Sequence, residues 1–433
     1  NSAQAFLARS RAIYAAAEEH GLTPYRLYFN GTVADSGGGG QITLGGASPG
    51  ASPFFVAQDL LPRLIRYVQG HPSLSYLFAH DFVGGSGQSV RTDERGDDAF
   101  RELRLALTLL GREAEPTPEV VWRSLAPFLT DAVGNSHRSE LNIEKLWNPF
   151  LPGRGQLGLV EFRAFRMQHT PERAVALVCL LRAVAAMLMH RDPPCSLEPW
   201  GEALHDRFAL PFCLEGDLFT VLQELATANL VLAKPIIDEL CRDEFRDQAE
   251  CVFHGVRLRL RRGLEFWPLL GDAGSQEGET SRLVDSSTQR LELTLVPEPG
   301  AEAAFAGWQV SVDGVVLPFQ DTERDGCPAK VMGVRYRSFV PWQGLHPTLG
   351  ARDGLRFFLH HAAIDEICEL TWHEWRPAKG PYAGLPRDRA EARERRAERL
   401  VTRRLDAGEL PAPRPAPDGS LTPWCLDLRW LGG

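Results

Sequence analysis

Apolar and polar residues repeat with different periods in the two halves of the chain. Before about residue 250, apolar residues recur at the three- and four-residue spacing of amphipathic helices. We expect helices at 3–20, 53–69, 97–110, 119–130, from Pro171 onward, and two or three more within 198–247. Short strands are expected at 25–30, 41–44 and 158–167. The first half is therefore predicted to combine helices with a small sheet.

After residue 250 the dominant period is two. We expect strands within 251–262, 290–296, 308–319, 330–340, 355–361 and 368–375. Within 308–319, Asp313-Gly314 lies between apolar runs, which indicates a hairpin. A charged helix at 388–404 and a Pro-rich tail at 411–423, typical of a linker or a poorly ordered terminus, follow.

The fold class predicted from these patterns is α+β. An α+β domain is expected over 1–250, a smaller, mostly antiparallel β domain over 251–380, and the charged helix with its tail over 381–433.

Composition narrows the class of protein. The chain has 433 residues, 44% of them hydrophobic, and a net charge of −9, which argues against binding to nucleic acid. Its longest apolar run, 174–189, is interrupted by Arg182 and is shorter than the roughly 20 residues of a membrane span, so we expect a buried helix and no membrane contact. Eight cysteines without a CxxC pair favour a reducing, cytoplasmic location. The chain opens at Asn1 inside a helical pattern, which leads us to expect that residues precede it.

A glycine-rich loop is the first candidate for chemistry. Gly37–Gly40 would let the backbone approach a ligand closely, with amides facing an anion. No Lys-Ser/Thr pair follows, so this is not a Walker loop. A flexible turn and a phosphate or substrate cradle both remain open.

A dense polar run covers residues 134–145. On a strand, Arg138, Glu140 and Asn142 would share one face. That face would offer a carboxylate to a hard cation and a guanidinium to phosphate. A solvated strand with an ion pair explains the same pattern equally well.

The strand expected at 158–167 is amphipathic. It presents the charged residues Glu161, Arg163 and Arg166. Glu161 alternates with Val160 and Phe162, so its side chain faces away from theirs. Such a strand is either an exposed edge or the wall of a polar pocket. Two strands of this kind within 30 residues favour the pocket.

Two further polar features are best explained by structural roles. The charged residues at 91–98 precede a predicted helix, and acidic residues there are expected to cap it. His205 lies on a predicted helix, and we expect it to be a structural histidine rather than a catalytic base.

Several segments together resemble a bacterial amidoligase family. They are SGGGGQITLGGASPGASPFF (36–55), HPSLSYLFAHDFVG (71–84), VRTDERGDDA (90–99), DAVGNSHRSELNIEKLW (131–147), LGLVEFRAFRM (157–167), WGEALHDRFALP (200–211), VDSSTQRLEL (284–293) and GVRYRSFVPWQGLHPT (333–348). The resemblance extends from about residue 3 to 404.

This resemblance implies a glutamine-synthetase-like carboxylate–amine ligase. Over 1–250 it implies an antiparallel sheet with helices packed around a site for ATP and Mg²⁺. The implied reaction is ATP-dependent formation of an amide or peptide bond through an acyl phosphate. Members usually form the C-terminal part of a longer protein that begins with a transglutaminase-like domain, so part of the ligase domain is expected upstream of this sequence.

The resemblance also assigns roles to individual residues. Glu140 and Glu161 would bind the metal, and Arg138 and Arg163, helped by Lys145, would stabilise phosphate. Asn135 and His137 would shape the site. A cradle for nucleotide or substrate would be formed by Gly37, Gly38, Gly39, Gly40 and Gln41.

Two departures from the family pattern motivate alternatives. The family loop typically ends in Gly-Asn-His, whereas this chain has Gly40 and Gln41. The family strand reads like ELRAFEM, whereas this chain has EFRAFRM, which places Arg166 where an acidic residue is usual and would reverse a charge near the metal. The alternatives are a degenerate, non-catalytic ligase-fold module that binds a peptide or partner, and an amide or peptide hydrolase.

Overall fold

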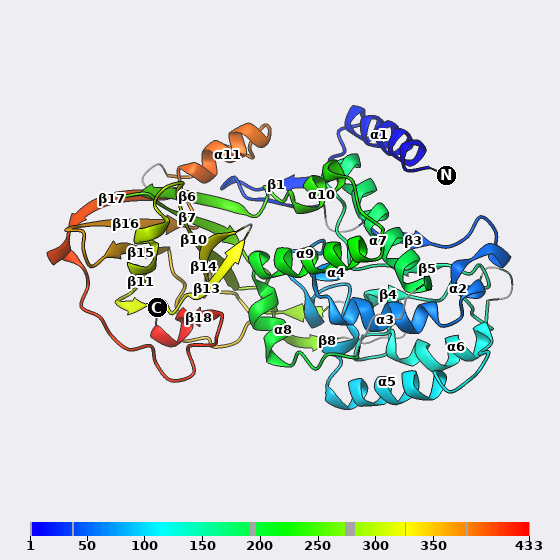
Figure 1. The fold of residues 1–433 in the computed structure, drawn as a ribbon. Coiled ribbons are helices and arrows are strands. Elements are labelled where there is room, and N and C mark those ends of the chain that lie inside the picture. Colours follow the sequence, from blue (N-terminus) through cyan, green and yellow to red (C-terminus); the bar gives the residue numbers. More distant parts are fainter. Residues whose placement is uncertain are drawn as a thin grey trace.

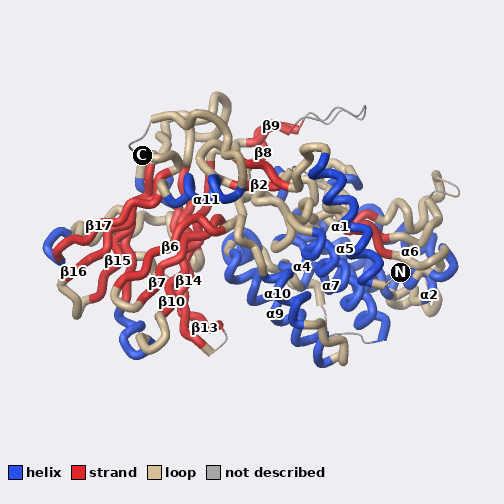
Figure 2. The backbone as a smooth tube through the Cα atoms, turned by 90° about the horizontal axis from the view of Figure 1, so that it is seen from above, coloured by secondary structure: helices blue, strands red, loops and turns tan. Residues whose placement is uncertain are grey.

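The computed structural model describes residues 2–36, 39–151, 153, 155–190, 196–272, 282–324, 326–377 and 380–432. Helices gather on one side of the molecule and long strands on the other (Figures 1 and 2). The predicted α+β class is confirmed, with sheets that are mostly antiparallel. Whether the boundary near residue 250 separates two domains stays a prediction, because one apolar cluster joins helix residues such as Leu214 to Ala329 and Val331 of the strand region.

The helical side is built from ten helices of the described residues. They are α1 (Ala3–Glu19), α2 (Pro53–Val56), α3 (Leu60–Gly70), α4 (Ser73–Tyr76), α5 (Asp97–Leu110), α6 (Pro118–Leu125), α7 (Pro171–His190), α8 (Glu202–Asp206), α9 (Pro211–Thr227) and α10 (Lys234–Cys241). Acidic residues open α5, where they complement the helix dipole. By length and composition alone α7 could span a membrane, but more than half of its most apolar stretch is buried inside the protein. It packs against α1, α3, α9 and α10, as a core helix does.

A small antiparallel sheet lies among these helices. Its strands are β3 (Ile42–Leu44), β5 (Val160–Phe162) and β4 (Leu141–Asn142), with β5 in the middle. Val160 and Phe162 are buried in the apolar cluster that α3, α7 and α9 share, so one face of the sheet is covered. The other face carries the polar residues of these strands. A separate hairpin, β1 (Tyr25–Leu27) and β2 (Val33–Asp35), lies beside it.

The strand-rich side is a two-layer sandwich with its own apolar cluster between the layers. One sheet runs in the order β13 (Gln320–Arg324), β14 (Cys327–Arg337), β10 (Thr288–Pro297), β7 (Val256–Arg262), β6 (Asp247–Phe253). The other runs in the order β12 (Val315–Val316), β11 (Trp308–Val312), β15 (Gly354–His361), β16 (Glu366–His373), β17 (Leu400–Asp406). A small pair, β8 (Leu269–Asp272) and β9 (Arg282–Val284), lies apart from them. The predicted hairpin at Asp313-Gly314 is present, and both residues have positive φ, as this tight turn requires.

The C-terminal region differs from the prediction. The charged helix α11 (Arg389–Ala397) ends before β17, so the expectation of helix through residue 404 is wrong. The Pro-rich segment is also not a free tail: the Arg414 amide donates to the Gly314 carbonyl, and Gln320 donates to the Pro423 carbonyl. After it, β18 (Cys425–Asp427) pairs in parallel with β14. This region therefore adds a strand to each layer of the sandwich. Charge spacing typical of a helix surface cannot distinguish these residues from an exposed edge strand.

Candidate functional site

The polar face of the β3–β5–β4 sheet gathers most of the predicted site. Glu161 lies at the centre of this face, with Thr43 of β3 opposite it on one side and Asn142 of β4 on the other. The apolar neighbours of Glu161, Val160 and Phe162, point into the core. The predicted amphipathic strand is thus present, although β5 is shorter than expected and ends at Phe162.

Glu161 is held by two cations. Its Oε1 lies 3.1 Å from Nη1 of Arg163, and its Oε2 lies 3.6 Å from Nζ of Lys145. The Glu161 side chain is 12% exposed, whereas that of Lys145 is 50% exposed. Lys145 can therefore move toward an incoming anion while Arg163 keeps the carboxylate in place.

A second carboxylate, that of Glu144, lies next to the group formed by Glu161, Arg163 and Lys145. Arg163 donates through Nε to the carbonyl oxygen of His137 (3.0 Å), and the His137 ring nitrogen Nε2 lies 3.0 Å from Oε2 of Glu144. The hydroxyl of Ser136 donates to the other Glu144 oxygen. Burial would raise the pKa of Glu144, but the hydrogen bonds from Ser136 and His137 outweigh burial and lower it. Glu144 is therefore a charged acceptor at the edge of the site.

A cavity of about 320 Å³ opens beside Ser136 and Glu144. Its wall includes Trp122, whose indole Nε1 is buried without a hydrogen-bond partner among the described residues, and the apolar side chain of Ile143. The cavity thus combines an apolar wall with the polar side chains of Ser136 and Glu144.

The other predicted site residues have mainly structural contacts. Asn135 accepts from the His137 amide at the start of the 3₁₀ turn Ser136–Arg138. Arg138 is buried in that turn, so the predicted strand does not reach it and the three polar residues 138, 140 and 142 do not lie on one continuous strand.

The glycine loop lies at the start of β3. Gly39 has positive φ, and a Cβ at Gly40 would overlap the backbone at Arg166. Both glycines therefore have a conformational reason to be there. Gln41 is exposed just before β3. Gly37 and Gly38 lie outside the described residues.

Glu140 lies in a buried network of its own. Its carboxylate is 3.7 Å from Nη1 of Arg91, which also contacts Asp93 (3.0 Å). Burial raises the pKa of Glu140 to about 7, because Arg91 offsets only part of the desolvation. No contact between Glu140 and Glu161 is among those of the described residues, so their shared role as metal ligands stays a prediction. The charged cluster at 91–98 only partly serves to cap α5, since Arg91 and Asp93 belong to this buried network.

Arg166 is not on the polar face. It is fully buried beyond the end of β5, where its Nη2 lies 2.7 Å from Oδ2 of Asp243 and its Nη1 lies 3.6 Å from Oδ1 of Asp81. Both carboxylates also contact Arg246. The expectation that Arg166 reverses a charge beside Glu161 is therefore corrected: its charge is compensated by two aspartates of a separate cluster.

The described residues contain no group of three or more His, Cys, Asp or Glu side chains placed to hold a metal ion. Mg²⁺ that arrives with a nucleotide needs only one or two protein carboxylates, because phosphate and water supply the other ligands. Glu161 and Glu144, beside the cations Arg163 and Lys145, have the donor chemistry for such a group.

Comparison with known families decides where the chain belongs. The model of a family described as "putative amidoligase enzyme" matches residues 1–429. The chain belongs to this amidoligase family. Comparisons with curated proteins and with solved structures give no match. Membership supports a ligase-type function and agrees with the resemblance seen in the motifs.

Two residues of this candidate site were not assigned a role from the sequence. Glu144 lies in the predicted polar run, seven residues after His137. This spacing does not by itself predict the contact between the two side chains. Trp122 comes from α6, which shows only an ordinary amphipathic pattern. Both reach the site through tertiary packing, which local spacing does not encode.

Proposed function

We propose that this amidoligase couples ATP to the formation of an amide or peptide bond between a carboxylate and an amine through an acyl phosphate. The observation that carries the proposal is the assembly of Glu161, Arg163, Lys145 and His137 on one face of the β3–β5–β4 sheet. Four residues named from the family motifs thus lie together, which chain positions alone do not require.

The charges on this face suit phosphoryl transfer. Such a reaction needs positioned cations at the phosphate oxygens and a carboxylate for the divalent metal. Arg163 is fixed by Glu161 and by the His137 carbonyl, so it can hold a phosphate oxygen without reorganising. Lys145 is more exposed and would follow the transferred group as a mobile point charge.

ATP with Mg²⁺ fits these residues. The nucleobase would enter the cavity beside Trp122, the phosphates would meet Lys145 and Arg163, and Glu161 with Glu144 would supply oxygen ligands to the metal. When bound, the nucleotide supplies the phosphoryl group that activates the carboxylate. We also propose the glutamine-synthetase-like arrangement, a cytoplasmic location and an attached transglutaminase-like domain, all implied by the family resemblance.

Release of ADP in the presence of mixed carboxylates and amines tests this function. Removing a preorganised donor to the transferred group lowers the rate about 10²-fold, and we expect this for Arg163→Met. Arg101→Met, at an exposed position of α5, serves as the matched control and should retain the wild-type rate. Amide cleavage without ATP would instead identify a hydrolase.

A non-catalytic ligase-fold module is the second candidate. It is favoured by the fact that both oxygens of Glu161 already face cations. In that case Arg163 and Lys145 neutralise Glu161, the carboxylate at the centre of this face, and no metal ion would bind there. Nucleotide binding without turnover in the unaltered full-length protein would support this candidate.

A further inference from the structure

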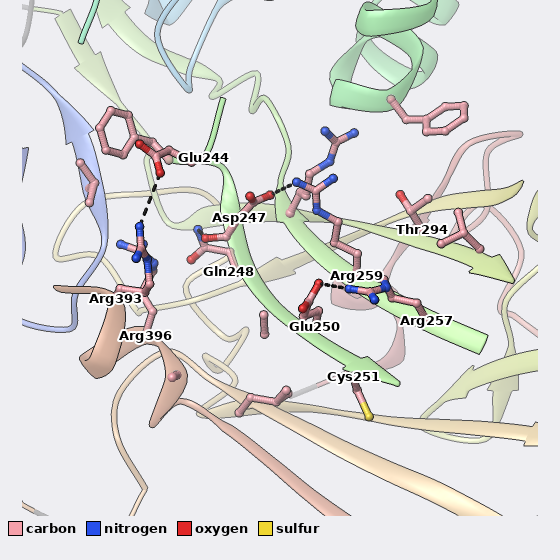
Figure 3. Close-up of a pocket in the computed structure, with 18 of the residues that line it drawn as sticks. Glu244, Asp247, Gln248, Glu250, Cys251, Arg257, Arg259, Thr294, Arg393 and Arg396 are labelled. Carbon is pink, nitrogen blue, oxygen red and sulfur yellow. Dashed lines mark hydrogen bonds and ion pairs between the residues drawn. The ribbon is translucent and has the colours of Figure 1, made fainter. Parts of the chain in front are cut away.

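A large cavity of the described structure lies far from the β5 site in the fold, on the sandwich. It has a volume of about 980 Å³ and lies over β6 and β7, with α11 and the start of β17 on its other side (Figures 1 and 3). β6 is an edge strand of its sheet, and no described strand pairs with its outer side. Residues of β7, β10, β13 and β14 also line the groove, so it crosses the sheet surface and at β6 reaches backbone that is open to a further strand.

Arginine dominates the lining of this groove. Seven arginines line it, from β7 (Arg257, Arg259, Arg261), β13 (Arg324) and α11 (Arg389, Arg393, Arg396), whereas three lining carboxylates, Glu244, Asp247 and Glu250, oppose them. Glu215, Glu292 and Glu298 lie outside the lining and pair with Arg261, Arg324 and Arg257, so the excess of positive charge is confined to the arginines of α11. Such a concentration attracts anions.

The uncompensated charge is at the α11 wall. The arginines of β7 each contact a carboxylate, for example Arg259 with Asp247 (2.5 Å). On α11, Arg389 and Arg393 share the single carboxylate of Glu244. Figure 3 shows Arg393 and Arg396 on the opposite side of the groove from Arg257 and Arg259.

Arg396 is the least compensated of these cations. It is 7% exposed, and among the described residues it makes no ion pair; its Nη1 donates to the carbonyl oxygen of Gly31 (2.6 Å). Burial and the nearby charges of Arg262 and Arg393 lower its pKa to about 10. A buried cation surrounded by like charges is stabilised when an anion arrives.

We propose that this groove binds an acidic peptide segment in an extended conformation. Its backbone lies along the open edge of β6, and its carboxylates pair with Arg393 and Arg396. Strand addition provides backbone hydrogen bonds, and the arginines provide selection for acidic side chains. This site goes beyond the proposed ligase function and does not depend on it.

The lining favours a peptide over nucleic acid. Single-stranded nucleic acid uses free aromatic faces for base stacking. Here the guanidinium of Arg324 covers Phe212 at 3.9 Å, and that of Arg389 lies over Phe245 at 4.8 Å. The carboxylates of Asp247 and Glu250 would also repel a continuous phosphate backbone, whereas a peptide can place neutral residues beside them.

Binding of a labelled peptide of alternating glutamate and glutamine to the full chain, followed by fluorescence anisotropy without nucleotide, tests the proposal. We expect saturable binding that weakens with salt, and protection of the β6 amides from hydrogen exchange. Charge reversal by Arg393→Glu, a largely exposed position, should weaken binding about tenfold, since each lost charge contact contributes a moderate factor. Arg356→Glu, on β15 and outside the groove, should leave affinity unchanged.

Three results would overturn the proposal. Equal affinity for an oligoglutamine peptide would remove the role of charge. Equal weakening by Arg356→Glu would show nonspecific attraction. Tighter binding of oligothymidylate, competing for the same residues, would identify nucleic acid as the ligand. Arg396→Gln should also weaken binding. If this substitution unfolds the protein, the affinity of Arg393→Glu still tests the proposal, because the Arg393 side chain lies on the surface of α11. Failure here would leave the ATP-dependent activity untouched.

Discussion

Arg163, the first residue after β5, forms an ion pair with Glu161 of that strand, with 3.1 Å between Nη1 and Oε1. The pair is fixed from outside the strand because Arg163 also donates to the His137 carbonyl. Two motifs that are more than twenty residues apart in sequence are thereby joined in one site. On this geometry we propose that Arg163 binds phosphate.

Restoring the usual acidic residue at position 166 is expected to damage the fold. Arg166→Glu places a third carboxylate beside Asp81 and Asp243, and breaking a buried pair costs about 3–5 kcal/mol. Arg166→Met should cost less, because Arg246 still faces both aspartates. Urea denaturation of the two variants measures the difference. A stable Arg166→Glu protein with new nucleotide turnover would support the degenerate-module candidate instead.

The stability of the protein should depend on Glu140 between pH 5 and pH 8. Its pKa in the folded state is about 7, above the ordinary value of 4.5, so the folded state retains a proton that the unfolded chain has released. The resulting stabilisation is complete below about pH 4.5 and is lost as pH rises through 7. Between pH 5 and pH 8 the unfolding free energy of the wild type should therefore fall by on the order of 2 kcal/mol more than that of Glu140→Gln, which has no carboxyl group to titrate there.

Chemical denaturation at the two pH values measures this shift. A difference between variant and wild type that does not change with pH would contradict the assignment. The same variant separates the two roles of Glu140: as a metal ligand it would abolish Mg²⁺-dependent ATP binding, whereas as part of the Arg91 network it would leave that binding in place.

Gly31 is expected to be essential for docking α11. It has φ +82, and a Cβ there would overlap the carbonyl oxygen of Ala392 and lie 2.9 Å from Cβ of Arg395. Gly31→Ala should cost about 3 kcal/mol or more, since the backbone strain of about 1–2 kcal/mol is added to a steric clash. Gly21→Ala is the matched control, with φ +72 and open space around the Cβ. If the two variants lose the same amount of stability in thermal denaturation, a steric clash at Gly31 is contradicted.

The thiols of Cys251 and Cys368 are expected to form a disulfide under mild oxidation. Their sulfur atoms lie 3.7 Å apart, across the two layers of the sandwich. The hydrogen bond from Cys368 lowers the pKa of the Cys251 thiol, which favours the reactive thiolate. A diamide oxidant would accept the two electrons and two protons that the thiols lose. Peptide mass spectrometry should find the 251–368 link, and a different cysteine pair in its place would contradict this expectation.

Local patterns predicted the fold better than the site. The helix expected at 97–110 matches α5, and Asp313-Gly314 forms the expected turn, because both depend on residues close in sequence. The alternation around Glu161 correctly separated the polar from the apolar face of β5. In contrast, the burial of Arg166 depends on Asp243, and that of Glu140 on Arg91, and neither partner is marked by any sequence period. The charge pattern predicts helix through residue 404, but residues 400–404 form part of the edge strand β17. An exposed edge strand and an exposed helix face can have the same composition.

Calorimetric titration of the full-length protein with ATP tests the central claim most directly. With Mg²⁺ present we predict saturable binding, and Lys145→Met should weaken it about tenfold through loss of one phosphate contact. Lys234→Met, which removes an exposed lysine of α10 that is likewise paired with a carboxylate, that of Asp238, should leave the affinity unchanged. Absence of ATP binding with Mg²⁺, or equal effects of the two substitutions, would contradict the account.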